Sequence, residues 1–314
     1  MAEAYDLDAT ADWLVCSTCG TQFPTTERSA LTTCFICDDP RQFTPPSGQS
    51  FTTLGALRAA GHRNEFTTYA ADPRVTFVAS VPKVGIGQRA CLLRTPAGNV
   101  LWDCVTLLDA DTVRRVHEMG GLAAVVISHP HYYSTHVEWA KAFGCPVYLS
   151  AADREWTTRD EPAQQVFLTE VETEIAVGGV GTGVKAVRLG GHFPGSMVLL
   201  FEGHLFVADT LLTTPAGLGS WATDALGTPR GRPAGMNSFA FMWSIPNFIP
   251  LSPEEIARMW GILKKYDFKS THGAFLGQDI EAVDVKKRVL DSMQIQTKFM
   301  GWTDHPFLNE SLES

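Results

Sequence analysis

Short apolar runs separated by turn residues predict a chain in which strands and helices alternate. Runs of about four to eight apolar residues are typical of buried strands. The turn 96–99, Pro-Ala-Gly-Asn, predicts a hairpin between two of them. The predicted strands cover residues 75–81, 90–95, 100–104, 123–127 and 147–149, then about 184–189, 197–201 and 204–208.

Capping residues predict where the helices begin. Thr135 and Glu138 have capping-box spacing, so a helix is expected to follow and to end near Gly144. Asp111 is expected to cap a helix that runs to Met119. A further helix should open at Ser-Pro-Glu-Glu, residues 252–255, and a last one should span about 280–299.

The strand predicted over 123–127 ends at a histidine-rich turn. Three histidines, His129, His131 and His136, lie within eight residues there. Ligands of α/β folds gather at the carboxyl ends of strands. Two histidines separated by one residue in an extended segment point the same way, so His129 and His131 can hold one metal ion. The alternative is a pair of surface histidines in a turn.

Composition narrows the class of protein. The chain has 314 residues, 45% of them hydrophobic and 19% charged, which suits one large α/β domain with a small appendage. A net charge of −9 argues against nucleic-acid or anionic-membrane partners, and leaves a small-molecule substrate as the expected partner. No apolar run reaches transmembrane length and residues 1–6 are acidic, unlike a signal peptide, so a cytoplasmic location is expected.

Four of the seven cysteines form two CxxC pairs with fourteen residues between them: Cys16, Cys19, Cys34 and Cys37. This spacing predicts a structural zinc site of the zinc-ribbon kind over about 12–40. Disulfides and redox motifs are the alternatives. Residues 44–53 are interpreted as a linker, so the zinc-ribbon-like module and linker should occupy 1–50 and the large domain 51–314. Four thiolates leave no open position, so this module is expected to be scaffolding.

Three more metal-binding side chains stand at predicted strand ends in the second half. His192 lies in a Gly-Gly-His loop, Asp209 ends an apolar run, and His272 precedes a glycine. Each alone is equally typical of a turn histidine, a capping aspartate or a partly buried histidine. Their recurrence at successive strand ends favours one site.

These motifs together resemble the metallo-β-lactamase-fold hydrolase superfamily. The matching segments are 91–103, Ser-His-Pro-His at 128–131, Gly-Gly-His-Phe-Pro-Gly-Ser at 190–196, Ala-Asp-Thr at 208–210 and Thr-His-Gly at 271–273. The resemblance implies an αββα four-layer sandwich. It further implies that His129, His131 and His192 form a first metal site, with Asp209 as a shared carboxylate and His272 as the last histidine of a second site.

The chain departs from the family pattern at that second site. The family motif reads His-x-His-x-Asp-His, and Tyr133 and Ser134 stand in its last two positions. One catalytic metal held by three histidines is therefore expected, with Asp209 as fourth ligand or close neighbour. Substitution of His136 for the lost histidine remains open.

A zinc ion at such a site would support hydrolysis by metal-bound hydroxide. The expected substrate is an ester, lactone, thioester or related bond in a small apolar metabolite. Tyr133 is expected to stabilise the oxyanion, or else simply to pack, and His272 to orient water. The long connection 211–250, rich in aromatics, is interpreted as a lid or as a loop with its own core.

Two other function classes fit the same residues. His131, His192 and Asp209 match the facial triad of a mononuclear non-haem Fe(II) dioxygenase, which some members of the superfamily are. The third class is a non-catalytic metal-binding protein. Metal analysis combined with oxygen consumption distinguishes the first two.

Overall fold

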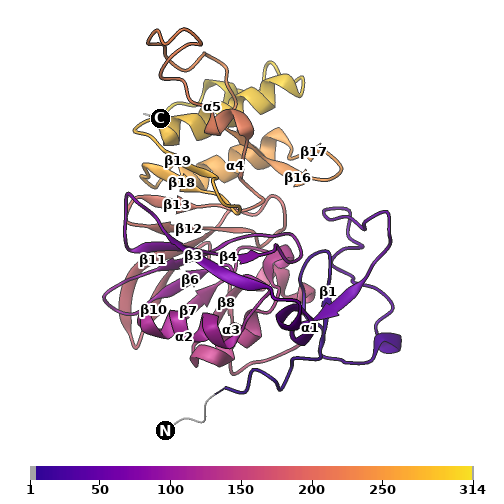
Figure 1. Cartoon of the computed structure of the whole chain (residues 1–314). Helices are drawn as coiled ribbons and strands as arrows, with labels where there is room; N and C mark the ends of the chain where they lie inside the picture. Colours follow the sequence, from indigo (N-terminus) through magenta and orange to yellow (C-terminus); the bar gives the residue numbers. More distant parts are fainter. Residues whose placement is uncertain (1–4, 313–314) are drawn as a thin grey trace.

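Two β-sheets lie face to face between two pairs of helices (Figure 1). The computed structural model describes residues 5–312. The first sheet has the order β3-β4-β5-β6-β7-β8-β9, antiparallel up to β6 and parallel from there on. Its strands are β3 (Arg63–Thr68), β4 (Val75–Val81), β5 (Ala90–Leu93), β6 (Val100–Trp102), β7 (Ala124–Val126), β8 (Val147–Ser150) and β9 (Gln165–Leu168).

The second sheet comes mainly from the second half of the chain and has the order β10-β11-β12-β13-β18-β19. All its neighbours are antiparallel except β13 and β18. Its strands are β10 (Glu172–Val177), β11 (Val180–Arg188), β12 (Met197–Phe201), β13 (His204–Phe206), β18 (Ser270–His272) and β19 (Asp279–Glu281).

Alternating side chains along each strand produce four layers, because successive residues of a strand point to opposite faces. On β5, Cys91 and Leu93 pack in the core between the sheets, whereas Leu92 packs with the helices α2 (Ala110–Glu118) and α3 (His136–Phe143). On β12, Leu199 faces the other sheet and Val198 faces α4 (Pro253–Leu263) and α5 (Val285–Phe299). The expected αββα sandwich is confirmed (Figure 1).

The N-terminal module lies beside this sandwich (Figure 1). Its strand β1 (Leu14–Cys16) pairs with β2 (Phe51–Thr53), and α1 (Leu54–Ala59) follows directly. The segment 44–53, interpreted as a linker, therefore ends in β2, and β2 pairs with β1 of the N-terminal module. The division at residue 50 stays a prediction.

Two helix starts and one capping interaction differ from the predictions. Asp109, not Asp111, caps α2, accepting a hydrogen bond from Thr112 N. Thr135 precedes α3 without capping it, because its hydroxyl donates to the Thr106 carbonyl instead, although α3 does end at Gly144 as expected. The last helix starts at Val285, since residues 279–281 pair with β18 as a strand.

The connection 211–250 contains short strands, namely β14 (Leu212–Thr213), β15 (Phe239–Ala240), β16 (Met242–Ser244) and β17 (Ile249–Pro250). Phe239 and Phe241 are buried among residues of α4 and α5, so these two aromatics belong to the core. Short 3₁₀ helices lie at η1 (Arg28–Ala30), η2 (Pro130–Tyr132), η3 (Ala151–Trp156), η4 (Pro215–Leu218) and η5 (Pro306–Asn309). Among residues 5–312, no helix has the length and hydrophobicity to cross a membrane.

Candidate metal centres

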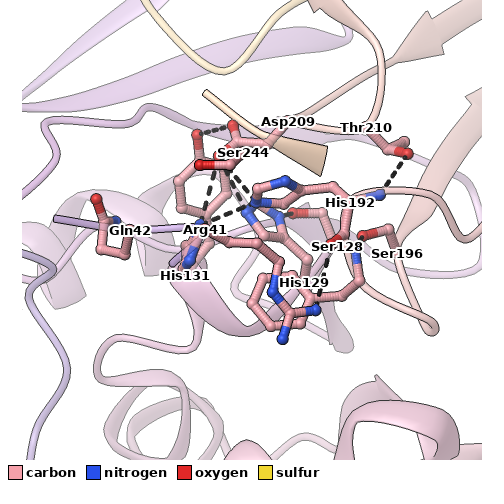
Figure 2. Close-up of polar contacts among 12 residues, drawn as sticks. Arg41, Gln42, Ser128, His129, His131, His192, Ser196, Asp209, Thr210 and Ser244 are labelled. Atoms are coloured by element: carbon pink, nitrogen blue, oxygen red, sulfur yellow. Dashed lines mark hydrogen bonds and ion pairs between the residues drawn. The ribbon is translucent and has the colours of Figure 1, made fainter. Parts of the chain in front are cut away.

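The side chains of three histidines and one aspartate point toward one another (Figure 2). From Asp209 Oδ2, the distances are 3.3 Å to His129 Nε2, 3.6 Å to His131 Nδ1 and 3.7 Å to His192 Nε2. His131 Nδ1 and His192 Nε2 are 3.1 Å apart. All four side chains are buried. The structure thus brings together the four ligands that the sequence predicts.

The ends of three strands position these side chains. His129 and His131 follow β7, His192 follows β11, and Asp209 follows β13. The loop to His192 needs Gly191 at φ +85°, where a Cβ would also lie 2.6 Å from Thr210 Oγ1. That Thr210 hydroxyl donates to the Gly190 carbonyl and accepts from His192 N, which fixes the loop.

The outer ring nitrogens of two ligands are held by the protein. His129 Nδ1 lies 2.9 Å from Ser128 Oγ, and His192 Nδ1–H donates to the Trp243 carbonyl at 2.9 Å. Such bonds fix the ring orientation and leave the inner nitrogen's lone pair free for a metal. His131 differs, since no group of residues 5–312 pairs with its outer Nε2.

The charges of the cluster suit a divalent cation. Burial lowers the pKa of His131 and of His192, so their imidazoles are neutral at physiological pH. Burial would raise the pKa of Asp209, but the neighbouring imidazoles, His129 foremost, hold it well below its usual range. His129 Nε2 is buried without a hydrogen-bond partner in the described chain and lies closest to the carboxylate. A tetrahedral ion with ligands at about 2.0–2.1 Å needs ligand atoms roughly 3.3 Å apart, close to the observed spacing.

Tyr132 is the residue of this site that the sequence analysis missed. Its hydroxyl donates to Asp209 Oδ1 at 2.8 Å, and burial keeps its pKa well above the usual value. It therefore orients Oδ2 toward the histidines. Tyr132 occupies a variable position of the motif, so only its nearness to two metal-binding histidines could have drawn attention to it.

Comparison with known proteins identifies the family. The model of the metallo-beta-lactamase superfamily matches residues 85–246. A protein of Bacillus subtilis (strain 168), the uncharacterized protein YmaE, is 36% identical over 84% of this chain and 88% of its own length.

The chain belongs to the metallo-β-lactamase superfamily.

Solved structures of the superfamily resemble it more distantly. The metallo-β-lactamase SMB-1 in complex with mercaptoacetic acid is 14% identical, covering 77% of this chain and 96% of that one, with a TM-score of 0.45. A flavo di-iron protein H90A mutant from Thermotoga maritima is 12% identical, covering 74% and 61%, with a TM-score of 0.41. The superfamily has a metal-dependent hydrolase-type fold, and this chain carries a metal-binding residue cluster within it.

Tyr133 and Ser134, which replace the superfamily's second-site ligands, form hydrogen bonds outside the histidine–aspartate cluster. Tyr133 donates its hydroxyl to the Asp153 carbonyl at 3.2 Å. Ser134 shares a hydrogen bond with Thr106 Oγ1 at 2.8 Å. The structure therefore does not bring the Tyr133 hydroxyl to the four ligands, in contrast to the predicted role at an oxyanion.

His272 is a second departure from the prediction. Its Nδ1 lies 2.7 Å from Asp279 Oδ1 and its Nε2 lies 3.0 Å from His204 Nδ1, so both nitrogens have partners outside the cluster. Its ring packs on Phe206 in the core between the sheets, because residue 272 points to that face of β18. A role in orienting water at the ligands does not fit this placement.

His136 also has both ring nitrogens occupied. Nδ1–H donates to the Tyr133 carbonyl at 2.8 Å, and Nε2 lies 2.9 Å from Gln165 Nε2. It cannot reach back as a substitute ligand. Within residues 5–312, the histidine–aspartate cluster and the cysteine cluster are the groups of three or more metal-binding side chains that meet.

The four N-terminal cysteines do meet, as the spacing predicts. Cys16 Sγ lies 3.6 Å from Cys37 Sγ, and Cys19 Sγ lies 3.7 Å from Cys34 Sγ, and none forms a disulfide. Tetrahedral zinc with bonds of about 2.3 Å places sulfurs roughly 3.8 Å apart. Hydrogen bonds between the thiols lower the pKa of Cys16 and raise that of Cys19, so full ionisation needs a cation. The set fits one tetrahedral metal ion.

The N-terminal module, expected to be scaffolding, also contacts the loop that carries His192. Arg41, four residues after Cys37, lies close to His192 (Figure 2) and donates to its backbone carbonyl. Its guanidinium carbon also lies 3.9 Å from the centroid of the Phe193 ring. Asp39 accepts two hydrogen bonds from the same guanidinium. The Pro40 carbonyl accepts from Ser244 Oγ at 2.6 Å, next to the Trp243 carbonyl that holds His192. The module thus contacts both the His192 loop and the segment whose Trp243 carbonyl accepts from His192.

A pocket of about 430 Å³ opens onto the cluster. His131 and Asp209 are among the residues that line it. The N-terminal module supplies one wall with Thr18, Arg41, Gln42 and Phe43, and the connection 211–250 supplies another with Leu212, Thr213, Ile245 and Pro246. Part of that connection therefore borders the site, as a lid would, while other parts belong to the core.

Proposed function

We propose that the protein is a zinc-dependent hydrolase that cleaves an ester, lactone, thioester or related bond in a small molecule. The observation that carries the proposal is the buried set of three histidine nitrogens and one carboxylate oxygen, two members of which line a pocket. A bound divalent ion there supplies Lewis acidity and lowers the pKa of a water ligand to about 7. Zinc is the metal that such a set of nitrogens with an open position favours.

The protein's own residues set the direction of attack. Of the four ligands, His131 and Asp209 line the pocket, so a substrate reaches the ion from their side. Tyr132 holds Oδ1 of Asp209 and leaves Oδ2 facing the ligand nitrogens, where Oδ2 would help to hold the ion. Because Oδ1 is taken by the tyrosine, Asp209 is poorly placed to bridge to a second ion. One catalytic ion fits this arrangement.

The pocket walls support a substrate with an apolar part. Ile86, Leu212, Ile245 and Phe275 line the pocket together with Phe43. Apolar walls with a few placed polar groups are typical of small-molecule sites. The Cys16–Cys37 cluster is proposed to hold a second zinc with a structural role.

The test is reconstitution after metal removal. Chelation should abolish hydrolysis of phenyl acetate, a thiophenyl ester and δ-valerolactone, and Zn²⁺ should restore at least one of these activities. Oxygen consumption should stay at background with either Zn²⁺ or Fe²⁺ and a thiol substrate. Hydrolysis that is indifferent to metal, or oxygen uptake supported by Fe²⁺ alone, would contradict the proposal.

A further inference from the structure

Three buried polar atoms in the pocket lining have no hydrogen-bond partner among residues 5–312. They are His131 Nε2, Thr213 Oγ1 and Gln278 Oε1. Buried polar groups in folded proteins are nearly always paired, because an unpaired one costs about 1–3 kcal/mol. Three such atoms around one pocket point to a ligand that pairs with them.

Thr213 and Gln278 face a common space beside Gly273. A Cβ at Gly273 would lie 2.5 Å from Gln278 Oε1 and 3.1 Å from Thr213 Oγ1. Glycine at this position keeps that space open. The backbone around it is fixed, since Gly273 N donates to the Gln278 carbonyl at 2.7 Å and Arg89 Nε donates to the Gly273 carbonyl at 2.9 Å.

The three atoms differ in what they can bind. His131 turns Nδ1 toward the other ligands, so its neutral ring carries the hydrogen on Nε2, which is a donor. Gln278 Oε1 is an acceptor, and the Thr213 hydroxyl both donates and accepts. The pocket therefore offers a donor beside the metal ligands, and an acceptor with a hydroxyl at the space beside Gly273.

We propose that Thr213 and Gln278 form a polar subsite for a hydroxyl or amide N–H group of the substrate, while a carbonyl oxygen of the same molecule accepts from His131 Nε2. The proposal rests on the proposed function and narrows it. The substrate is then not a plain apolar ester but one that carries a hydrogen-bond donor near the scissile bond.

Pairs of esters of equal shape test the subsite. Phenyl hydroxyacetate differs from phenyl propanoate by a hydroxyl in place of a methyl group on the acyl side. 2-Hydroxyethyl phenylacetate differs from propyl phenylacetate in the same way on the alcohol side. The zinc-loaded protein should prefer the hydroxyl member of at least one pair about tenfold in kcat/KM, mainly through KM, because a site that hydrogen-bonds a substrate hydroxyl discriminates against its apolar analogue.

Two near-isosteric variants remove the subsite's polar atoms. Thr213→Val and Gln278→Met should each reduce that preference to about threefold or less. Thr76→Val is the matched control, because Thr76 Oγ1 is also buried without a partner but belongs to β4 and does not line the pocket. It should keep the full preference. No preference in either pair, or a preference that both variants retain, would overturn the proposal.

Failure of hydrolysis can be told apart from failure of the subsite. If the zinc-loaded protein cleaves none of the four esters, binding is measured by saturation-transfer NMR with N-phenyl hydroxyacetamide and N-phenyl propanamide. Stronger saturation transfer to the hydroxyl compound, lost in Thr213→Val and Gln278→Met but kept in Thr76→Val, would leave the subsite standing without the hydrolase. Equal transfer to both compounds, or none to either, overturns the subsite.

Discussion

The cysteine cluster and the histidine–aspartate cluster have almost the same spacing but opposite surroundings. In both, ligand atoms lie at tetrahedral distances and all side chains are buried. Four thiolates around a divalent ion leave a net negative centre with no open position, whereas three neutral imidazoles and one carboxylate leave it positive and Lewis acidic. Among the described residues that line the 430 Å³ pocket are His131 and Asp209 of the second cluster, and none of the four cysteines. Donor charge and access, more than geometry, separate a structural site from a reactive one.

The two regions are nevertheless joined. Residues 39–41 lie just after Cys37. The Arg41 guanidinium donates to the His192 carbonyl, and the Pro40 carbonyl accepts from Ser244, the neighbour of Trp243. A substitution in residues 39–41 should therefore change the metal affinity of the histidine–aspartate cluster.

The largest expected effect is the loss of metal from the histidine–aspartate cluster alone. His192→Ala removes one of three nitrogen ligands, so the large domain should lose its ion and hydrolysis should fall to background. The cysteine cluster shares no ligand with it and should keep its metal. Elemental analysis should find about one metal equivalent lost per chain. Loss of both ions, or of neither, would contradict the prediction that the two clusters bind metal independently.

A smaller effect is expected when a residue of the N-terminal module is changed and metal affinity is measured in the large domain. Arg41→Met removes the hydrogen bond to the His192 carbonyl and the charge above Phe193, so His192 is held less firmly. Metal affinity of the large domain should fall about tenfold, the lower end of what the loss of such supporting groups costs. Competition with a chromophoric chelator measures it.

Arg28→Met is the control for this prediction. Arg28 also lies over an aromatic ring in the N-terminal module, Phe51, but it has no contact with the His192 loop. Its substitution should leave the metal affinity of the large domain unchanged. Equal losses in the two variants would show that only the general stability of the module matters.

Substitutions of the neighbouring Tyr132 and Tyr133 should have different effects on kcat. Tyr132→Phe removes the hydroxyl that orients Asp209 and should lower kcat about tenfold, since one such hydrogen bond is worth about 1–1.5 kcal/mol. Tyr133→Phe removes only the bond to the Asp153 carbonyl and should leave kcat within about twofold, with a modest loss of stability. Steady-state kinetics of both variants, with metal content checked, decides between them. The reverse order would restore Tyr133 as the oxyanion donor.

The smallest effect concerns pH and stability. Burial lowers the pKa of His136 to about 4, below its ordinary value near 6.5. Between these values the unfolded chain binds a proton that the folded chain does not, so stability should fall as pH drops from 6.5 toward 4, by at most about 3 kcal/mol for this group. His136→Gln should show a correspondingly shallower pH dependence in urea unfolding. An unchanged slope would mean that His136 does not titrate in this way.

Local patterns in the sequence were enough to predict much of this molecule. The strand-end histidines, Asp209 and the CxxC pairs were predicted from apolar runs and motif spacing, whereas the αββα order was predicted from the resemblance to the superfamily. What failed depends on side-chain direction and on long-range contacts. His272 turns to the core face of its strand, and Tyr132 rather than Tyr133 points at Asp209. The hydrogen bond from Arg41 to the His192 carbonyl joins residues 151 positions apart, and no local pattern indicates such a contact.

Locating every metal ion in the chain tests the central claim most directly. Anomalous diffraction from crystals of the protein purified without added metal should show two ions per chain. One should lie among the four cysteines, and one among His129, His131, His192 and Asp209, with the Tyr132 hydroxyl on the other oxygen of Asp209. Two adjacent ions in the large domain, or an ion bound by His272, would contradict the account.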